Sequence, residues 1–179
     1  MVTVKQLNTH ELEAGLAEIR RSPKNDGRLE MIVRRPRIDE REMLDQAQLD
    51  PLEGLVGDNW RARDGSANPD TQITIMNSRA AALLAGGRER WQLAGDQLFI
   101  DLDLGGENLP AGTRLAIGSS VLEVSAKAHN GCKKFVGRYG LDAMEFVNSE
   151  LGRQLHLRGI NARVIQPGSI RVGDIVRKA

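Results

Sequence analysis

Short runs in which polar and apolar residues alternate recur along this chain and predict β-strands. Residues 71–76 (Thr-Gln-Ile-Thr-Ile-Met) are typical, because a strand points successive side chains to opposite faces. Turn residues separate such runs at intervals of about ten positions. By this pattern, strands are expected at residues 29–34, 71–76, 97–102, 114–117, 121–125, 162–165, 169–171 and 174–177. Since no regular alternation of strand and helix accompanies them, the pattern favours a β-barrel over a parallel sheet.

Helical spacing is confined to a few segments, of which the first lies near the start of the chain. Thr9 is expected to cap a helix in which Leu12, Leu16 and Ile19 recur at intervals of four and three. Turn-forming residues at 22–27 then end this helix. The pattern divides the chain into an N-terminal helical extension, residues 1–28, and a barrel domain, residues 29–179.

The segments between the strands are assigned in the same way. Further helices are predicted at residues 40–49, from Asn77 or Ser78 to Ala85, and at 142–151 with Asp142 as the cap. The Gly-Asp pairs at 57–58, 95–96 and 173–174 are interpreted as tight turns that feed strands. The run Arg34-Arg35-Pro36-Arg37 is interpreted as a solvated turn, and the charged residues 61–70 as an exposed, mobile loop.

Composition narrows the class of protein. The chain has 179 residues, 40% of them apolar and 27% charged, which suits one globular domain. A net charge of +1 and an aromatic content of 3% argue against specific nucleic-acid binding. No apolar run is long enough to cross a membrane, and the first residues lack the apolar core of a signal peptide. A single cysteine excludes an intrachain disulfide, which suits a reducing compartment. Together these features lead us to expect a cytoplasmic protein with no membrane partner.

Candidate chemistry gathers around that cysteine, Cys132. Lys133 and Lys134 follow it directly, Arg138 lies six residues on, and His129 lies three residues before it. Nearby positive charge lowers the pKa of a thiol and favours the reactive thiolate. His129 could reach the thiol across a glycine turn as a base or orienting partner, or it could be structural. A buried, inert thiol is the alternative for Cys132, but glycine and lysine neighbours are unusual for a core position.

The same stretch carries a family resemblance. His-Asn-Gly-Cys-Lys-Lys-Phe-Val-Gly-Arg-Tyr-Gly-Leu-Asp-Ala, residues 129–143, resembles the signature of MOSC domains, named after the C-terminal domain of molybdenum cofactor sulfurases. Gly-Leu-Val-Gly-Asp at 54–58 resembles the family's opening motif, and residues 105–115, 157–164 and 168–174 resemble its central and closing motifs, in order. The resemblance runs from about residue 30 to the end and indicates a stand-alone bacterial type. It implies a mainly β fold, a closed or partly open barrel with a few peripheral α-helices.

The resemblance also implies roles for residues. Cys132 matches the family's sulfur-handling or metal-binding residue, and His129 is expected beside it as a catalytic group. Arg138 has the fork geometry that suits an anion such as phosphate, although a salt bridge would also explain it. Arg158 could bind the phosphate of a pterin cofactor, with a simple turn at residues 159–161 as the alternative for its motif. The residues expected to bind molybdenum cofactor are Lys133, Arg138, Arg158, Asn161 and Asn108, with turn formation as the alternative for the two asparagines.

Two functions of different kinds remain open at this stage. In the first, Cys132 carries sulfur as a persulfide or ligates molybdenum, for example in a reductase of N-hydroxylated compounds. Such a protein needs a sulfur donor or an electron-transfer partner, because the chain has no flavin or iron–sulfur motif. In the second, the barrel is a non-catalytic module that binds a cofactor or partner, with the N-terminal helix as a docking or homo-oligomer face. Full-length sulfurases add a pyridoxal-phosphate domain for which this chain has no room, so no pyridoxal phosphate is expected.

Overall fold

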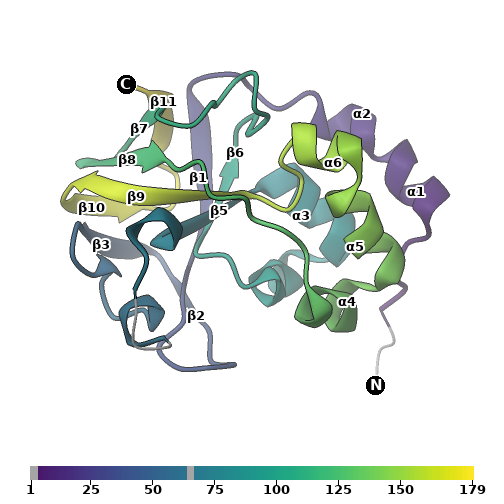
Figure 1. The fold of residues 1–179 in the computed structure, drawn as a ribbon, viewed down its shortest axis with the longest axis horizontal. Coiled ribbons are helices and arrows are strands. Elements are labelled where there is room, and N and C mark those ends of the chain that lie inside the picture. The colour runs from purple at the N-terminus through teal and green to yellow at the C-terminus, as the bar shows by residue number, and fades with distance from the viewer. Residues whose placement is uncertain (1–3, 64–66) are drawn as a thin grey trace.

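A β-barrel with helices packed against one side forms the structure, a computed structural model that describes residues 4–63 and 67–179 (Figure 1). Its strands are β1 (Gly27–Arg34), β2 (Glu42–Leu44), β3 (Gln46–Asp50), β4 (Gly54–Leu55), β5 (Ile73–Asn77), β6 (Leu98–Asp101), β7 (Arg114–Ile117), β8 (Ser120–Val124), β9 (Ile160–Gln166), β10 (Gly168–Arg171) and β11 (Ile175–Lys178). The barrel closes in the order β11-β7-β8-β9-β5-β6-β1, because β1 pairs back with β11. The predicted closed, mainly β barrel with peripheral helices is therefore confirmed.

Strand β1 is shared between the barrel and its extensions. Its first residues pair with β11 through Gly27 and Val176, and its last residues pair with β2 through Ile32 and Leu44. Strands β5 and β6 are parallel, and the connection between them carries a helix and a 3-10 helix. A second, smaller sheet has the order β10-β3-β4.

The α-helices are short and gather on one side of the barrel (Figure 1). They are α1 (Thr9–Ala14), α2 (Leu16–Ile19), α3 (Ser78–Ala85), α4 (Lys133–Tyr139), α5 (Leu141–Asn148) and α6 (Glu150–Gln154). The 3-10 helix η3 (Arg88–Ala94) packs with α3 and α4, whereas η1 (Trp60–Ala62) and η2 (Pro69–Thr71) lie away from the α-helices. Helix α3 agrees with the prediction: the Asn77 side chain accepts bonds from two backbone N–H groups, and Gly86 ends the helix at φ 77°. Within the described ranges, no helix is long and apolar enough to cross a membrane.

Several predicted helix ends are wrong because side chains cap differently from the sequence expectation. Asn8, not Thr9, caps α1 in a reciprocal pair with Glu11, and Gly15 separates α1 from α2. Asp142 does not cap α5, whose N-cap is Gly140. Its carboxylate instead accepts a bond from the Thr9 backbone N–H at 3.0 Å, which ties α1 to α5.

The helix predicted at residues 40–49 is also wrong. This stretch is rich in helix-forming residues but forms β2 and β3. Leu49 is buried in the barrel core, and Ala47 packs against that core. The inward-facing residues therefore recur every two positions, as in a strand, although the local composition favours a helix. Pairing with β1 and β10 therefore overrides propensity. Of the loop expected at residues 61–70, residues 64–66 lie outside the described part, and its flanks form η1 and η2.

The strands that face the helices are buried on both sides. In β1, Leu29 and Ile32 point into the barrel, whereas Met31 and Val33 belong to a second core beneath the helices. Phe99 of β6 joins that second core. Met76 of β5 and Leu157, which follows α6, also belong to it, and the remaining members come from α1, α2, α3, η3, α4 and α5. The N-terminal helices and the cysteine-bearing segment therefore pack against the same strands.

One glycine lets the chain pass close to β5 just before β9. Gly159 has φ +126°, and a Cβ there would lie 2.4 Å from the Ile75 carbonyl oxygen and 3.1 Å from Cδ2 of His129. A side chain at this position would therefore be strained and would push against both the barrel and the His129 ring.

We predict that Gly159→Ala lowers the free energy of unfolding by at least about 2 kcal/mol, because it adds a backbone clash to an unfavourable φ. Gly137→Ala is the matched control. Gly137 lies in α4, and a Cβ there would meet no atom within 4 Å, so we expect a gain of about 0.5–1 kcal/mol. Urea unfolding followed by circular dichroism measures both variants, and equal effects would contradict the close approach at residue 159.

Candidate functional site

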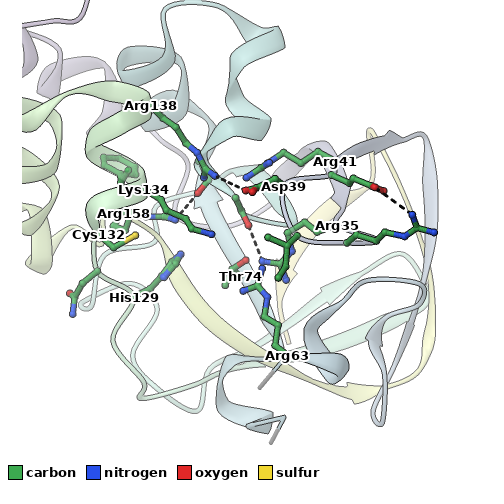
Figure 2. Close-up of a pocket in the computed structure, with 17 residues that line it drawn as sticks. Arg35, Asp39, Arg41, Arg63, Thr74, His129, Cys132, Lys134, Arg138 and Arg158 are labelled. Carbon is green, nitrogen blue, oxygen red and sulfur yellow. Dashed lines mark hydrogen bonds and ion pairs between the residues drawn. The ribbon is translucent and has the colours of Figure 1, made fainter. Parts of the chain in front are cut away.

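A cavity of about 410 Å³ opens between α4 and the loop that follows β1 (Figure 2). Cys132, Lys134 and Arg138 line it from the α4 side, and Thr74 lines it from the barrel. Its cationic lining residues are Arg35, Arg37, Arg41, Arg63, Lys134, Arg138 and Arg158, against the acidic Asp39 and Glu40. Such an excess of positive charge in a concave site favours an anionic ligand.

A turn of backbone acceptors holds three of these arginines in place. We call residues 93–96 the acceptor turn; it begins at the end of η3 and passes through Gly95, whose φ is +89°. The Leu93 carbonyl accepts from Arg138 Nη1 at 2.6 Å, the Ala94 carbonyl from Arg158 Nη2 at 2.8 Å, and the Gly95 carbonyl from Arg35 Nη1 at 2.9 Å. The last carbonyls of a helix lack helical partners and carry partial negative charge, which is why guanidinium groups gather there.

The last residue of the acceptor turn, Asp96, is fully buried between Arg158 and His129. Its Oδ2 accepts from Arg158 Nη1 at 2.5 Å, and its Oδ1 lies 2.9 Å from His129 Nε2. Burial alone would raise the pKa of this carboxyl, but the charge of Arg158 and hydrogen bonds from Arg158 and His129 hold it below its usual value. Asp96 therefore stays ionised and fixes both side chains.

Asp96 also sets which nitrogen of His129 faces the cavity. A carboxylate accepts hydrogen bonds only, so Nε2 of His129 carries the hydrogen toward Asp96. In the neutral ring, Nδ1 is then left as an acceptor. The ring is half-buried and lines the cavity beside Cys132 (Figure 2).

Cys132 lies at the mouth of the cavity, at the residue that precedes α4. The side chain is exposed, and the thiol is free. Partial burial would raise the pKa of the thiol, but the backbone N–H groups of Phe135 and Lys134 and the charges of Arg158 and Arg138 together lower it. The thiolate is the form that attacks electrophiles or ligates a soft metal.

Two buried guanidinium nitrogens have no acceptor within the described part of the chain. They are Nε of Arg41 and Nε of Arg158. Burial and the charge of Arg138 lower the pKa of Arg41, since an uncompensated positive charge there is unfavourable. A buried donor without an acceptor is costly, so both atoms point to an anion or polar group that belongs in the site.

The structure brings together most of the predicted site residues. Cys132, His129, Arg138 and Arg158 all line the cavity. Asn161 lies beside it, lining an adjoining cavity of about 340 Å³ that shares Arg35, Arg63, Thr74 and His129. Asn161 is buried and donates to the Lys127 and Ala128 carbonyls, so it holds the segment that leads to His129.

Two predicted residues are not brought to the site. Lys133 points elsewhere, and its neighbour Lys134 lines the cavity, because the segment expected as a loop is the helix α4 and only one lysine faces inward. Asn108 lines a separate cavity and donates to the Lys24 and Asp103 carbonyls. Motif order alone does not tell on which side of the barrel a loop lies.

Sequence reasoning missed four contributors. Arg35 was assigned to a solvated turn, yet it is buried and pairs with Asp58 through two bonds of 3.0 and 2.8 Å. Arg41 fell inside the wrongly predicted helix, and Arg63 inside the loop expected to be mobile. Asp96 was interpreted as a turn residue; the signal that could have found it is that two Gly-Asp pairs, 57–58 and 95–96, each supply a buried partner to an arginine.

A family model of the MOSC domain matches residues 58–177. The chain belongs to the MOSC domain family. The family predicted from the sequence motifs is thereby confirmed. Among solved structures, YuaD from Bacillus subtilis is 19% identical, with a TM-score of 0.59 over 84% of this chain and 93% of that one. YiiM from Escherichia coli is 20% identical, with a TM-score of 0.56 over 85% of this chain and 69% of that one. At these identities the likeness shows a shared fold, and no curated protein sequence matches.

The site of this MOSC protein offers a metal few ligands of its own. Within residues 4–63 and 67–179, no three His, Cys, Asp or Glu side chains are grouped to hold a metal ion.

We predict that Asp96→Asn lowers the free energy of unfolding at pH 7 by about 3 kcal/mol, because it removes the partner of a buried arginine. The folded pKa of Asp96 lies below the unfolded value, about 3.9. The stabilisation from its carboxylate is thus present above that value and is lost as the pH falls through the folded pKa. The variant should lose less stability than wild type over this acid range in urea titrations. Asp142→Asn, which changes an exposed hydrogen bond between α5 and the Thr9 backbone, should cost under about 1 kcal/mol.

We predict that Cys132 reacts with iodoacetamide with a pH midpoint below that of a free cysteine, about 8.5. Arg138→Gln removes a positive charge that favours the thiolate, so its midpoint should rise. Arg20→Gln also removes one positive charge, but Arg20 is exposed and lines the separate cavity that contains Asn108. This variant should therefore leave the midpoint unchanged. Rates followed by mass spectrometry across pH 5–10 decide, and equal midpoints in all three proteins would contradict the electrostatic account.

Proposed function

We propose that this MOSC protein binds the pterin form of molybdenum cofactor in the Cys132 cavity, with Cys132 as its protein ligand. The observation that carries the proposal is one thiol of lowered pKa at the mouth of a cavity lined by seven lysines and arginines. The cofactor supplies a molybdenum centre that exchanges electrons and oxygen with a substrate. The chain's own residues supply charge, orientation and a titratable group.

The described residues fit such a molecule in three ways. The cavity has the size of a small-ligand site, and its cations match a phosphate group. Arg41 and Arg158 each offer a buried Nε–H that lacks an acceptor. The soft thiolate of Cys132 suits molybdenum, while the absence of further grouped ligands among the described residues suits a metal that arrives already held by sulfur atoms.

The remaining site residues have separable tasks in this proposal. Arg138 and Lys134 would neutralise the anionic part of the cofactor. Arg41 would donate its unpaired Nε–H to the same anionic group. His129, oriented by Asp96, would offer Nδ1 of its neutral ring as a hydrogen-bond acceptor to the bound molecule. A reaction that fits is reduction of N-hydroxylated compounds, with electrons from a separate partner protein.

A second candidate, sulfur transfer, is favoured by the exposure of Cys132. An exposed thiolate of lowered pKa can attack the outer sulfur of a donor protein's persulfide, so that a new S–S bond forms on Cys132, the donor's S–S bond breaks and the donor leaves as a thiolate. The cationic cavity would stabilise the anionic persulfide on Cys132, whose outer sulfur an acceptor thiolate can take in the same way. The third possibility is a non-catalytic barrel that binds a cofactor or a partner protein. In that case replacing Cys132 should not weaken the binding of the partner protein.

We expect protein expressed in a host that makes molybdenum cofactor to carry about one molybdenum and one pterin per chain. Cys132→Ala should lose the molybdenum, and Arg41→Gln should lower the pterin content, because the first removes the ligand and the second the unpaired donor. Arg20→Gln serves as the charge-matched control and should retain both. Metal analysis by mass spectrometry and pterin fluorescence after oxidation provide the measurements.

Wild-type protein that holds neither molybdenum nor pterin would overturn cofactor binding. A mass increase of one sulfur atom on Cys132, absent in Cys132→Ser, would then support the sulfur carrier. Loaded protein that fails to reduce N-hydroxylated compounds with a chemical electron donor would leave a cofactor-binding module.

A further inference from the structure

A second cavity lies behind the wall of the Cys132 site. It has a volume of about 540 Å³, larger than the Cys132 cavity, and lies between the loop before β7, the residues after β8 and helix α6. His129, Asn130 and Arg158 line both cavities, whereas Cys132 lines only the first. The second cavity is therefore a separate space that shares a wall with the first.

The lining of this cavity combines an apolar surface with positive charge. Its accessible apolar surface comes from the exposed residues Pro110, Ala111, Ala126 and Ala128. The buried apolar residues Leu109, Val124, Val147 and Ile160 also line it but are almost inaccessible. The charged groups are Lys127, Arg153 and Arg158, with His129 and His156 beside them, and none of the aspartates and glutamates in the described ranges lines the space. Small-molecule sites typically have this composition, a mainly apolar wall with a few convergent polar groups.

Two of the three cations that line this cavity, Lys127 and Arg153, are exposed and unpaired among the described residues, whereas Arg158 is buried and paired with Asp96. The side chains of Lys127 and Arg153 have no hydrogen-bond or ion-pair partner within the described part of the chain, although most arginines of this protein do. Arg158 is the buried member of the group, and its Nε lacks an acceptor. Asp96 neutralises the other end of Arg158 but does not line this cavity.

We propose that this second cavity binds a small organic monoanion with an apolar body, such as an aromatic carboxylate, independently of what occupies the Cys132 cavity. The apolar wall takes the body of the ligand, and Arg153 and Lys127 hold its charged group. A cation is disfavoured because these two unpaired positive charges line the space and no carboxylate of the described residues does. A strongly hydrated anion such as inorganic phosphate gains nothing from the apolar wall.

The test uses 2-naphthoate as probe and isothermal titration calorimetry with the wild-type chain. We expect saturable binding of one molecule per chain, and binding of the neutral 2-naphthamide at least about tenfold weaker, since a charge-assisted bond to a carboxylate is lost. Arg153→Gln should weaken naphthoate binding about tenfold and leave naphthamide binding almost unchanged. Ala126→Trp and Ala111→Trp, at two exposed positions that line this cavity, should abolish binding of both probes by filling the space.

Two controls locate the probe. Arg20→Gln, with the same loss of charge away from the cavity, should bind naphthoate as wild type does. Protein whose Cys132 has been alkylated with iodoacetamide should also bind it normally, because Cys132 does not line the second cavity. Loss of binding on alkylation would place the probe in the Cys132 cavity and overturn the proposal. So would equal affinity for naphthoate and naphthamide, or undiminished binding in both tryptophan variants with native circular dichroism spectra.

Discussion

The acceptor turn at residues 93–96 is the constraint on which the site depends. Three consecutive carbonyls and one buried carboxylate bind three arginines and a histidine that come from distant parts of the chain. The turn belongs to the connection between the parallel strands β5 and β6, so its position is fixed by the barrel. Because the end of η3 presents unpaired carbonyls, it collects positive charge without needing an acidic cluster that would cancel that charge in the cavity.

This arrangement orders the arginines while leaving part of each guanidinium group for a ligand. An arginine has five N–H donors, and the acceptor turn takes one from Arg138 and one from Arg35, with Asp96 and Asp58 taking others. Side chains held in this way lose little freedom when an anion binds, which is the physical meaning of a preorganised site. The exposed Cys132 is then surrounded by fixed positive charge, and the lowered pKa of its thiol follows from that field and from the N–H groups of α4.

The helices make the site possible by covering one side of the barrel. Strands β1, β5 and β6 are buried on both faces, and Phe135 and Tyr139 of α4 are anchored in the core that lies between barrel and helices. Phe135 also lies beneath the Arg158 guanidinium, at 5.1 Å from the ring centre, so the anchor of α4 and the buried arginine support each other. The segment from Lys127 to Cys132 crosses between these layers, which is why cavities open on both sides of it.

Sequence alone determined the barrel class, most strand positions, the capped helix α3 and the identity of the reactive segment. These features are local: alternation of period two, an asparagine cap and a C-terminal glycine, and a run of residues around one cysteine each carry their own signal. Only the tertiary structure decided that residues 42–50 pair as strands, that Lys134 rather than Lys133 faces the cavity, and that Asn108 lies elsewhere. It also decided the roles of Arg35, Arg41 and Asp96, because a charged residue in a turn has the same local pattern whether it is solvated or buried. What separates the two outcomes is a partner more than twenty residues away, such as Asp58 for Arg35 or Arg158 for Asp96, and no local pattern records that distance.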